Sequence, residues 1–576
     1  MVRLLSIFIL LIFSFHSLMG QHWVASVTPN QNETNAAAAT EINIEFTEGI
    51  ILETLNQGGL QVHGSLSGLI SPGGLTYDAN SFTATFTPPA DFKAGETITV
   101  SVTTITHNSA AGVTMPDPYV WKFKVASAPA TAQFAVSSTI TNVGSGNDAP
   151  YFITVGDFNN DGHVDLATAN KTSSNISILI NDGSGNFTNP ANPAAGGTPD
   201  AITAADFNRD GFLDLAVANA NNGQAGILLN DGQGNFAAPV QVAVGNFPHG
   251  INSGDLNGNG LMDIAVSNFN SASVSILRNS SNGTFTPESS PGVNNGVESA
   301  LIADFNNDGD LDIAVSHFST SNFIVMENDN SGSFTPVANS NLGSSAHLAG
   351  AGDFNGDGWV DAIVSHNASN NLTILMNDMT GSLVPQPTLN QTGSPWSALA
   401  CDLDGDGDQD LATTSYNSAR LFIWENNGQG SFTQKPSIIV GSNPHLAVAA
   451  DFNGDNALDL AVANDGANSV SILLNQPTVG IEDDVPTAPR GFSLAQNYPN
   501  PFNPSTTIEF FVPKRSDVTL SVFNPVGKKV AMLVNENLVP GKHGINWDAT
   551  NLPSGVYFYR LEANGFEDTR KMILLR

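Results

Sequence analysis

One motif recurs seven times in this chain at a fixed interval of 49 residues. Its first copy runs from Asp157 to Asp165 and reads Asp-Phe-Asn-Asn-Asp-Gly-His-Val-Asp. Further copies begin at Asp206, Asp255, Asp304, Asp353, Asp402 and Asp451. A constant pitch of this length is typical of repeat proteins, whose units bury their apolar faces against one another. We therefore expect the chain between these copies to fold as a series of equivalent units.

The motif has the chemistry of a loop that binds a hard cation. Side-chain oxygens stand at positions 1, 3, 5 and 9, and glycine at position 6 allows a sharp turn, which together suit calcium. An EF-hand would need a glutamate at position 12, whereas that position holds Thr168 in the first copy and valine or threonine in the others. These residues favour strands, so the loop is expected to join two strands. A turn in which Asp and Asn act as caps without metal remains the alternative.

The seven copies resemble the FG-GAP/VCBS repeats of integrin α-subunit propellers and bacterial surface proteins. This resemblance implies Ca²⁺ as the cofactor and predicts these metal ligands: Asp157, Asn159, Asp161, Asp165, Asp206, Asn208, Asp210, Asp214, Asp255, Asn257, Asn259, Asp263, Asp304, Asn306, Asp308, Asp312, Asp353, Asn355, Asp357, Asp361, Asp402, Asp404, Asp406, Asp410, Asp451, Asn453, Asp455 and Asp459. Two loops depart from the pattern. The third has only two carboxylates, and the seventh has Asn456 in place of glycine.

The way in which the repeats begin and end predicts a closed ring. Each full unit ends in a Gly-x-Phe type hairpin such as Gly185-Asn-Phe187, but the seventh stops near Asn475. A strand-like run from Phe134 to Val143 precedes the first motif and can supply the missing outer strand. Such an exchange removes free sheet edges. We expect a seven-bladed β-propeller over residues 130–476, with a linear solenoid as the alternative.

The N-terminal part reads as a leader followed by a separate domain. Residues 1–20 have one basic residue, Arg3, and then an apolar run, as expected of a secretory signal peptide. Residues 21–127 contain short alternating strands such as Thr97-Ile-Thr-Val-Ser-Val, and their layout is similar to that of bacterial Ig-like domains. We expect a β-sandwich that serves as a spacer.

The C-terminal part predicts the export route. Residues 477–491 form a polar, Pro-punctuated linker. Residues 492–576 read as a second Ig-like sandwich, and Gln496-Asn-Tyr-Pro-Asn-Pro-Phe and the terminal Lys571-Met-Ile-Leu-Leu-Arg closely resemble the C-terminal sorting domain of type IX secretion substrates. The resemblance implies the type IX machinery as a partner. It also implies passage through the periplasm of a Gram-negative bacterium, followed by release or attachment at the outer cell surface.

Charge excludes one class of partner. The chain has a formal net charge of −34, and residues 130–476 hold five basic residues, Lys171, Arg209, Arg278, Arg420 and Lys435. Nucleic acids need clustered Lys and Arg, so no nucleic-acid partner is expected.

Beyond the leader, no segment is long and apolar enough to span a bilayer as a helix.

A second set of residues at the same interval is a candidate ligand-binding surface. Six residues before each motif Asp, at the start of the innermost strands, the side chain varies among aromatic, acidic and imidazole groups. The residues are Tyr151, Asp200, His249, Glu298, His347, Trp396 and His445. In a closed ring these seven should encircle one mouth of the central channel. Aromatic faces beside carboxylates suit sugar rings, and three histidines could instead hold a metal. Solvated strand starts without a ligand are the alternative.

These features together predict an all-β protein, with a seven-bladed β-propeller flanked by N-terminal and C-terminal Ig-like β-sandwiches. We expect a secreted or cell-surface calcium-binding module for adhesion to glycan or protein. No catalytic motif such as Gly-x-Ser-x-Gly or His-Glu-x-x-His is present, and no catalytic residue is predicted. A secreted polysaccharide lyase or hydrolase that uses the propeller mouth stays open as the alternative.

Overall fold

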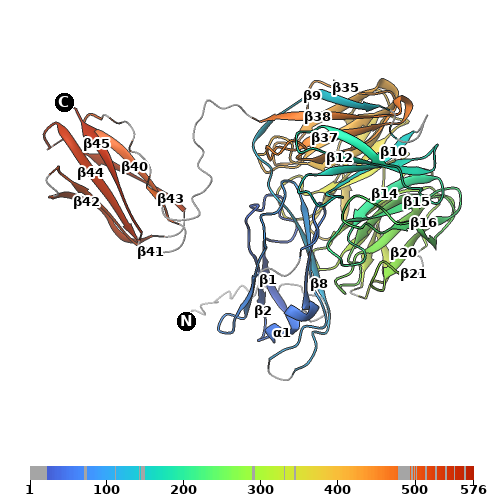
Figure 1. Ribbon diagram of the computed structural model, residues 1–576, viewed down its shortest axis with the longest axis horizontal. Helices are drawn as coiled ribbons and strands as arrows, with labels where there is room; N and C mark the ends of the chain where they lie inside the picture. Colours follow the sequence, from blue (N-terminus) through green and yellow to red (C-terminus); the bar gives the residue numbers. More distant parts are fainter. Residues whose placement is uncertain are drawn as a thin grey trace, which may run out of the picture. The chain divides into compact units, whose positions relative to one another are not determined.

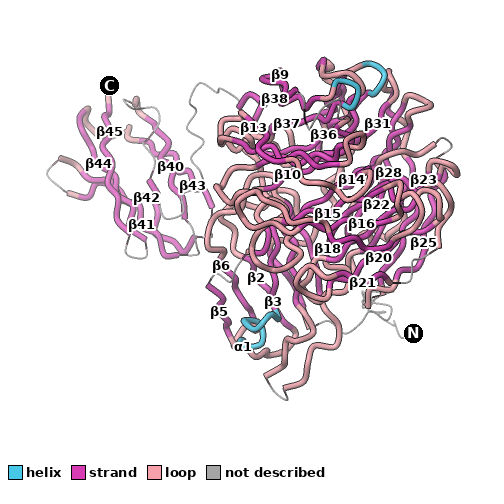
Figure 2. The backbone as a smooth tube through the Cα atoms, turned by 45° about the vertical axis from the view of Figure 1, so that its right-hand side comes forward, coloured by secondary structure: helices cyan, strands magenta, loops and turns pink. Residues whose placement is uncertain are grey.

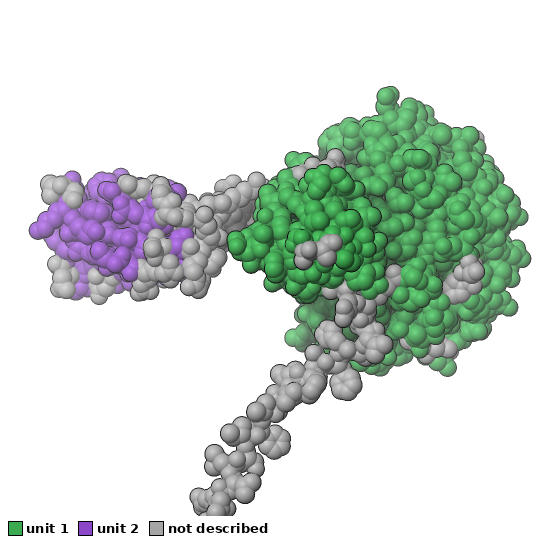
Figure 3. Space-filling view, turned by 90° about the horizontal axis from the view of Figure 1, so that it is seen from below, with its two compact units in different colours: residues 1–478 green, residues 479–576 purple. Residues whose placement is uncertain are grey.

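The chain folds into two compact units, residues 1–478 and 479–576, which Figure 3 colours green and purple. The computed structural model describes residues 23–477 except 71–73, 110–111, 142, 144–148, 289–291, 330 and 343–344. In the second unit it describes 493–494, 497, 500, 502–512, 516–525, 528–538, 541–550, 552–563 and 566–575. The expected signal peptide, residues 1–20, and the linker from residue 478 to residue 491 lie outside the described residues.

Within the described part of the first unit, seven antiparallel sheets follow one another in chain order after the N-terminal domain. Their strands can be followed by their labels in Figures 1 and 2. The innermost strands are β10 (Pro150–Gly156), β14 (Pro199–Ala205), β18 (Pro248–Gly254), β22 (Val297–Ala303), β26 (Ala349–Gly352), β31 (Pro395–Cys401) and β36 (Pro444–Ala450). Each contacts the next, and β36 contacts β10, so the sheets form a closed ring. The predicted seven-bladed propeller is confirmed.

The second strand of each blade begins at the last Asp of the motif. These strands are β11 (Asp165–Asn170), β15 (Asp214–Asn219), β19 (Asp263–Asn268), β23 (Asp312–His317), β27 (Asp361–His366), β32 (Asp410–Ser415) and β37 (Asp459–Asn464). Every residue in each of them is buried. Sequences such as Asp-Leu-Ala-Val-Ala-Asn fit this position, because both faces of the strand lie against neighbouring blades.

The outer strands complete the blades. The third strands are β12 (Asn175–Asn181), β16 (Gln224–Leu228), β20 (Ser273–Asn279), β24 (Asn322–Asn328), β28 (Asn371–Asn377), β33 (Arg420–Glu425) and β38 (Ser469–Pro477). Outside them lie β13 (Phe187–Ala191), β17 (Val240–Ala243), β21 (Phe285–Pro287), β25 (Phe334–Asn341), β29 (Leu383–Pro385) with β30 (Leu389–Asn390), and β34 (Thr433–Gln434) with β35 (Ile438–Ile439). In the seventh blade, β9 (Ala130–Thr141) takes this place.

The strand exchange joins the two ends of the propeller sequence. Strand β9 pairs antiparallel with β38, with Phe134 opposite Asn475 and Thr141 opposite Ser469. The seventh blade thus combines three strands of the last repeat with one strand from before the first repeat. The ring cannot open without breaking this pairing, because its backbone hydrogen bonds would be left unpaired at two edges.

A buried asparagine at the end of each third strand ties each blade to the preceding one. These residues are Asn181, Asn230, Asn279, Asn328, Asn377, Asn426 and Asn475. In each case the side-chain amide donates to a backbone carbonyl in the metal-type loop of the neighbouring blade, as from Asn377 to Phe305 at 2.8 Å. Asn181 makes this bond to Phe452 at 2.9 Å, across the closure of the ring. Buried amide bonds of this kind fix the angle at which neighbouring blades meet.

The N-terminal domain is a sandwich of two four-stranded sheets. One contains β1 (Val24–Thr28), β2 (Ile42–Phe46), β6 (Thr83–Thr87) and β5 (Gly74–Asp78); the other contains β4 (Gly68–Leu69), β3 (Leu60–Gly64), β7 (Thr97–Val102) and β8 (Tyr119–Lys124). Its core includes Ile42, Trp121 and Phe123, which come from facing sheets. Helical structure among the described residues is limited to the short turns α1 (Leu52–Thr54), η1 (Leu55–Gly59), η2 (Tyr416–Ser418) and η3 (Asp465–Ala467).

The second unit is also a two-sheet sandwich. One sheet orders β39 (Ser493–Leu494), β40 (Ser505–Val512) and β43 (Gly541–Asp548), and the other orders β42 (Lys529–Leu538), β41 (Ser516–Phe523), β44 (Gly555–Ala563) and β45 (Phe566–Leu574). Its core includes Trp547 and Tyr559. Among the described residues, no helix is long and apolar enough to cross a membrane.

We expect Asn377→Ala to destabilise the propeller. The substitution removes side-chain bonds to the carbonyls of Phe305 at 2.8 Å and Val360 at 3.1 Å and leaves both buried carbonyls without this donor. An unsatisfied buried polar group costs about 1–3 kcal/mol. The midpoint of thermal unfolding should fall, while Asn270→Ala, at an exposed position, should leave it unchanged. Equal midpoints for the two variants would contradict a structural role for the amide.

Candidate functional site

The seven motif loops share one backbone geometry. In the first loop, the N–H groups of Asp161 and Gly162 donate to the two carboxylate oxygens of Asp157, at 3.1 and 2.9 Å. Gly162 has a φ of 93°, a conformation that glycine adopts without strain. The position-6 N–H makes the same bond in the other loops as well. The loop therefore curls around its own acidic side chains.

The seventh loop keeps this geometry although Asn456 replaces the glycine. Asn456 has a φ of 64°, and its N–H donates to Asp451 at 2.8 Å. Asparagine is among the residues that adopt this left-handed conformation most readily. The departure noted in the sequence therefore does not change the shape of the loop.

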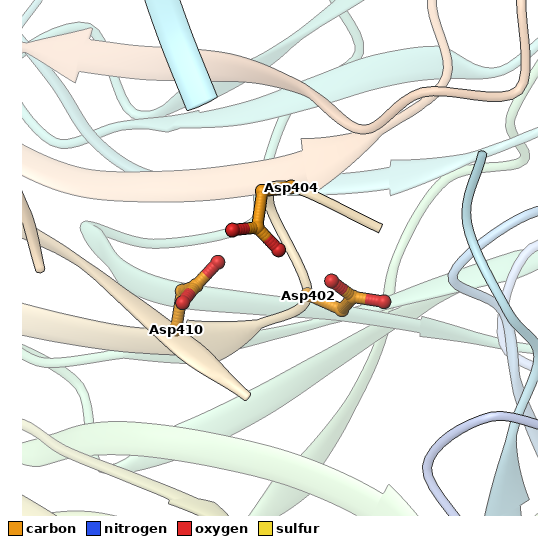
Figure 4. A group of neighbouring side chains, drawn as sticks. All are labelled: Asp402, Asp404 and Asp410. Carbon is orange, nitrogen blue, oxygen red and sulfur yellow. The ribbon is translucent and has the colours of Figure 1, made fainter. Parts of the chain in front are cut away.

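The sixth loop shows most directly that its side chains fit a cation. Oxygens of Asp402, Asp404 and Asp410 all lie within 4.8 Å of one another, and Figure 4 shows the three carboxylates gathered at the loop. They stand at positions 1, 3 and 9 of the motif. Three carboxylate oxygens at this separation suit a hard divalent ion such as calcium, which takes six to eight oxygen ligands.

The electrostatics of these loops favour a bound cation. Burial, together with neighbouring carboxylates, raises the pKa of Asp410 to about 8, and burial with the neighbouring Asp406 raises that of Asp404 to about 7. Burial likewise raises the pKa of Asp165 in the first loop to about 7. Carboxylates held this close together repel one another when ionised, and a divalent ion removes that cost.

The N-terminal domain lies on the face of the ring that carries these loops. Contacts from this domain and from the connector that follows it reach all seven loops: Lys93 with Asp157, Gln61 with Arg209, His63 with Gly260, Gln31 with Asp304, Asn32 with Gly358, Ser127 with Asp402, and Ala128 with Asn456. The Lys93 ammonium is 3.2 Å from the Asp157 carboxylate. The domain is therefore docked on this face through specific polar contacts.

A cavity of about 380 Å³ lies between this domain and the propeller. Thr154, Thr203 and Ser253 of the innermost strands line it on one side, and Lys122 and Lys124 of β8 line it on the other. The Lys124 ammonium donates to the Gln409 side chain at 2.8 Å. The N-terminal domain thus covers the central channel at its loop end.

The seven candidate ligand residues lie together at the opposite mouth of the channel, and we call them the mouth ring. Contacts link them in blade order. The Lys171 ammonium lies 4.0 Å from the centroid of the Tyr151 ring and pairs with Asp200, and side-chain nitrogen–oxygen distances are 3.7 Å for His249 with Asp200, 3.2 Å for His249 with Glu298, and 3.9 Å for His347 with Glu298. Ring centroids are 4.2 Å apart for His347 and Trp396, 4.8 Å for Trp396 and His445, and 3.6 Å for His445 and Tyr151. The side chains form one unbroken circuit around the channel.

Irregular strand pairing aims these side chains at the channel. The register between the first and second strands shifts between Pro150 and Phe152, so that Tyr151 is the extra residue. Similar shifts contain Asp200, His249, Glu298, Trp396 and His445. A β-bulge re-aims a side chain and is common beside functional sites. The sequence carries a partial signal for it, since proline precedes Tyr151, Asp200, His249, Trp396 and His445.

Most of the mouth ring is buried. Asp200 and His445 are 0% exposed, and His249, Glu298 and His347 are at most 6% exposed, whereas Tyr151 and Trp396 are half-buried. Burial lowers the pKa of His347 to about 3 and that of His445 well below its usual value, and burial raises the pKa of Glu298. The two ring nitrogens of His445 and the indole N–H of Trp396 are buried, and none of them has a hydrogen-bond partner among the described residues. Such groups normally find a protein or water partner.

A second variable set of residues surrounds the mouth ring, and sequence reasoning missed it. Fourteen residues after each motif Asp, directly after the second strand, stand Lys171, Ala220, Phe269, Phe318, Asn367, Tyr416 and Asp465. Tyr416 stacks on Trp396 with ring centroids 4.5 Å apart, Phe318 lies 6.2 Å from His347, and Phe269 lies 6.1 Å from His249. The 49-residue interval was visible in the sequence, but only the closed ring places this set beside the mouth.

Models of three protein families match parts of the chain. The FG-GAP-like repeat matches residues 157–217, 206–266, 255–315, 304–364, 353–413 and 402–462. The bacterial Ig-like domain matches residues 22–125, and the secretion system C-terminal sorting domain matches residues 496–575. No curated protein matches this chain.

Several solved structures are similar to this chain at low identity. BBS1N in complex with ARL6DN shares 12% identity and a TM-score of 0.44, over 62% of this chain and all of that one. The periplasmic gluconolactonase PpgL of Pseudomonas aeruginosa shares 16% identity and a TM-score of 0.40, over 65% and 96%. PorZ, a surface component of the type IX secretion system of Porphyromonas gingivalis, shares 11% identity and a TM-score of 0.39, over 96% and 75%. These values are too low to indicate a function.

His347 and His445 of the mouth ring, whose pKa values burial lowers, should make stability depend on pH. Because the folded state lowers the pKa of His347 to about 3, protonation below about pH 6.5 favours the unfolded chain. The contribution of neutral His347 to the free energy of unfolding is complete above pH 6.5 and should decrease as the pH falls, by up to about 1.4 kcal/mol per pH unit. The unfolding midpoint of His347→Gln should therefore depend less on pH between 7 and 5 than that of the wild type. His163→Gln, at an exposed position, is the control and should follow the wild type.

Proposed function

This chain belongs to the FG-GAP-like repeat family, and we propose that it is a secreted, calcium-stabilised β-propeller that binds a glycan at the mouth ring. The sorting domain at residues 496–575 indicates export by type IX secretion to the cell surface or the extracellular space. Binding of the sugar and binding of calcium take place on opposite faces of the propeller. The face with the mouth ring, where the sugar binds, presents variable side chains, and the loop face, where calcium binds, presents a repeated motif.

Calcium binding is supported by the geometry of the loops. The three converging carboxylates of Asp402, Asp404 and Asp410 offer oxygens at the separation that a divalent ion needs. In this proposal, the residues at positions 1, 3, 5 and 9 of each loop hold the ion. The bound ion offsets the repulsion among buried carboxylates, and so stabilises the propeller rather than taking part in chemistry.

Removal of calcium should lower the thermal unfolding midpoint of the propeller. A ligand that binds only the folded state stabilises it, and each occupied loop adds to this effect. Asp404→Asn removes one carboxylate from the sixth loop at nearly constant volume, and should reduce the shift that calcium produces. Asp329→Asn, in an exposed hairpin outside the loops, is the control. An identical midpoint in calcium and in chelator would refute the calcium proposal.

Glycan binding rests on one observation, the platform of stacked aromatic rings at the mouth. Trp396 and Tyr416 lie 4.5 Å apart with an angle of 26° between their planes, and both are half-buried. Flat aromatic faces of this kind can stack on the apolar face of a sugar ring. The Tyr416 hydroxyl lies 3.5 Å from Asp465, which places an acceptor for sugar hydroxyls at the edge of the platform.

Trp396→Ala should weaken sugar binding on the order of tenfold or more, because it removes half of the platform. A stacking contact of about 1.5 kcal/mol corresponds to a tenfold loss. A glycan array of residues 21–490 would identify the sugar class, and calorimetry with that sugar would give the loss. Trp359→Ala, a half-buried tryptophan on the loop face, is the matched control and should bind normally.

The same experiment separates binding from the other candidate functions. Cleavage of the bound polysaccharide, abolished by Glu298→Gln, would establish a lyase or hydrolase instead of a binding module. A blank array with folded protein would contradict the glycan proposal and would direct the search to protein partners.

A further inference from the structure

The third metal-type loop differs from the others in its charge. Its positions 1, 3, 5 and 9 are Asp255, Asn257, Asn259 and Asp263, so it has two carboxylates where the second loop has three and the sixth has four. Calcium affinity in such loops rises with the number of charged ligands. The third loop is therefore the weakest of the seven in ligand charge, yet its backbone bonds from Asn259 and Gly260 to Asp255 match those of the other loops.

A buried arginine lies directly against this loop. Arg278 stands on β20 and is 7% exposed. Its Nη1 donates to Oδ2 of Asp263, the position-9 carboxylate, at 2.7 Å. Asp263 itself is fully buried, and its Oδ1 accepts the backbone N–H of Asn279 at 2.8 Å. The guanidinium thus neutralises one of the only two carboxylates in the loop.

The register of Arg278 shows that this contact is specific to the third blade. At the same place in the other six blades the residues are Ile180, Leu229, Glu327, Met376, Glu425 and Leu474. In those blades the position-9 Oδ2 accepts a backbone N–H, as from Phe207 to Asp214 at 3.0 Å. A cation on this carboxylate and the loss of a third carboxylate therefore occur in the same blade.

Arg278 also makes contacts between the third and fourth blades. Its Nε donates to Glu288, in the outer part of its own blade, at 2.8 Å, and its Nη2 donates to the carbonyl of Gly332 in the hairpin of the fourth blade. A planar guanidinium can hold several acceptors at fixed angles, and a buried one persists only when it is paired. The side chain joins the loop, the blade and its neighbour at one point.

We propose that Arg278 is the built-in cation of the third blade and that this loop is held in shape without calcium. This inference rests on the proposed calcium binding of the other loops. With the guanidinium counted, the third site carries a formal charge of only −1, which is too little to compete for a divalent ion at the concentrations that fill the other loops. The third and fourth blades would then stay joined when calcium is withdrawn.

The test is the number of calcium ions bound per chain. Wild type, Arg278→Leu/Asn259→Asp and Met376→Leu are compared by equilibrium dialysis against calcium, with calorimetry of the same proteins. The double variant removes the guanidinium and restores the third carboxylate, so it should bind one more ion than the wild type. Leucine is the natural residue in this register in the second and seventh blades. Met376→Leu, the same register in the fifth blade, should bind as many ions as the wild type.

A measurement on the unaltered protein covers the case in which the double variant does not fold. Crystals of the wild type grown in calcium should give anomalous peaks in other loops but none beside Asp263. A peak there, or an unchanged ion count in a folded double variant, would overturn the proposal for Arg278. A wild type that binds no calcium at all would instead overturn the proposed calcium function, so the two failures are distinct.

Discussion

The fold depends on a hydrogen bond that is made once per blade, from a buried asparagine amide to a carbonyl of the preceding blade. Because the donor ends a third strand and the acceptor lies in a motif loop, each bond ties the outer part of one blade to the loop of its neighbour. The bond from Asn181 to Phe452 closes the circle together with the exchanged strand β9. The metal-type loops are therefore part of the contacts between blades, and a change in a loop is felt by two blades at once.

The closed ring has two faces that present different side chains. On the loop face, repeated acidic motifs meet the N-terminal domain, which covers the channel and, together with the connector after it, contacts all seven loops. On the opposite face, the strand starts, six of which are bulged, bring the seven side chains of the mouth ring into one circuit. On the loop face one loop geometry is repeated, whereas on the opposite face one residue per blade varies between the repeats while the strands stay the same. The proposed sugar platform of Trp396 and Tyr416 lies on the second face.

Charge on the loop face is balanced in more than one way. Lys93 of the N-terminal domain pairs with the first loop, and Arg278 pairs with the third, where the number of carboxylates is lowest. The sixth loop has four carboxylates, and three of them converge on one point. Built-in cations and bound cations solve the same problem, since either one removes the repulsion among buried carboxylates. The proposal that the loops differ in calcium occupancy follows from these differences.

The sequence alone determined the fold class, the number of blades, the sorting domain and the positions of the mouth ring, because each is written as a pattern at a fixed interval or as a local motif. It also pointed to the third loop as unusual through Asn259. It could not show that Arg278 reaches Asp263, that Tyr416 stacks on Trp396, or that Lys93 lies on Asp157. These pairs depend on how β-bulges, blade twist and domain docking place residues that lie far apart in the chain or point across a loop. The spacing of a repeat specifies which residues are equivalent, but only the packed ring decides which of them touch.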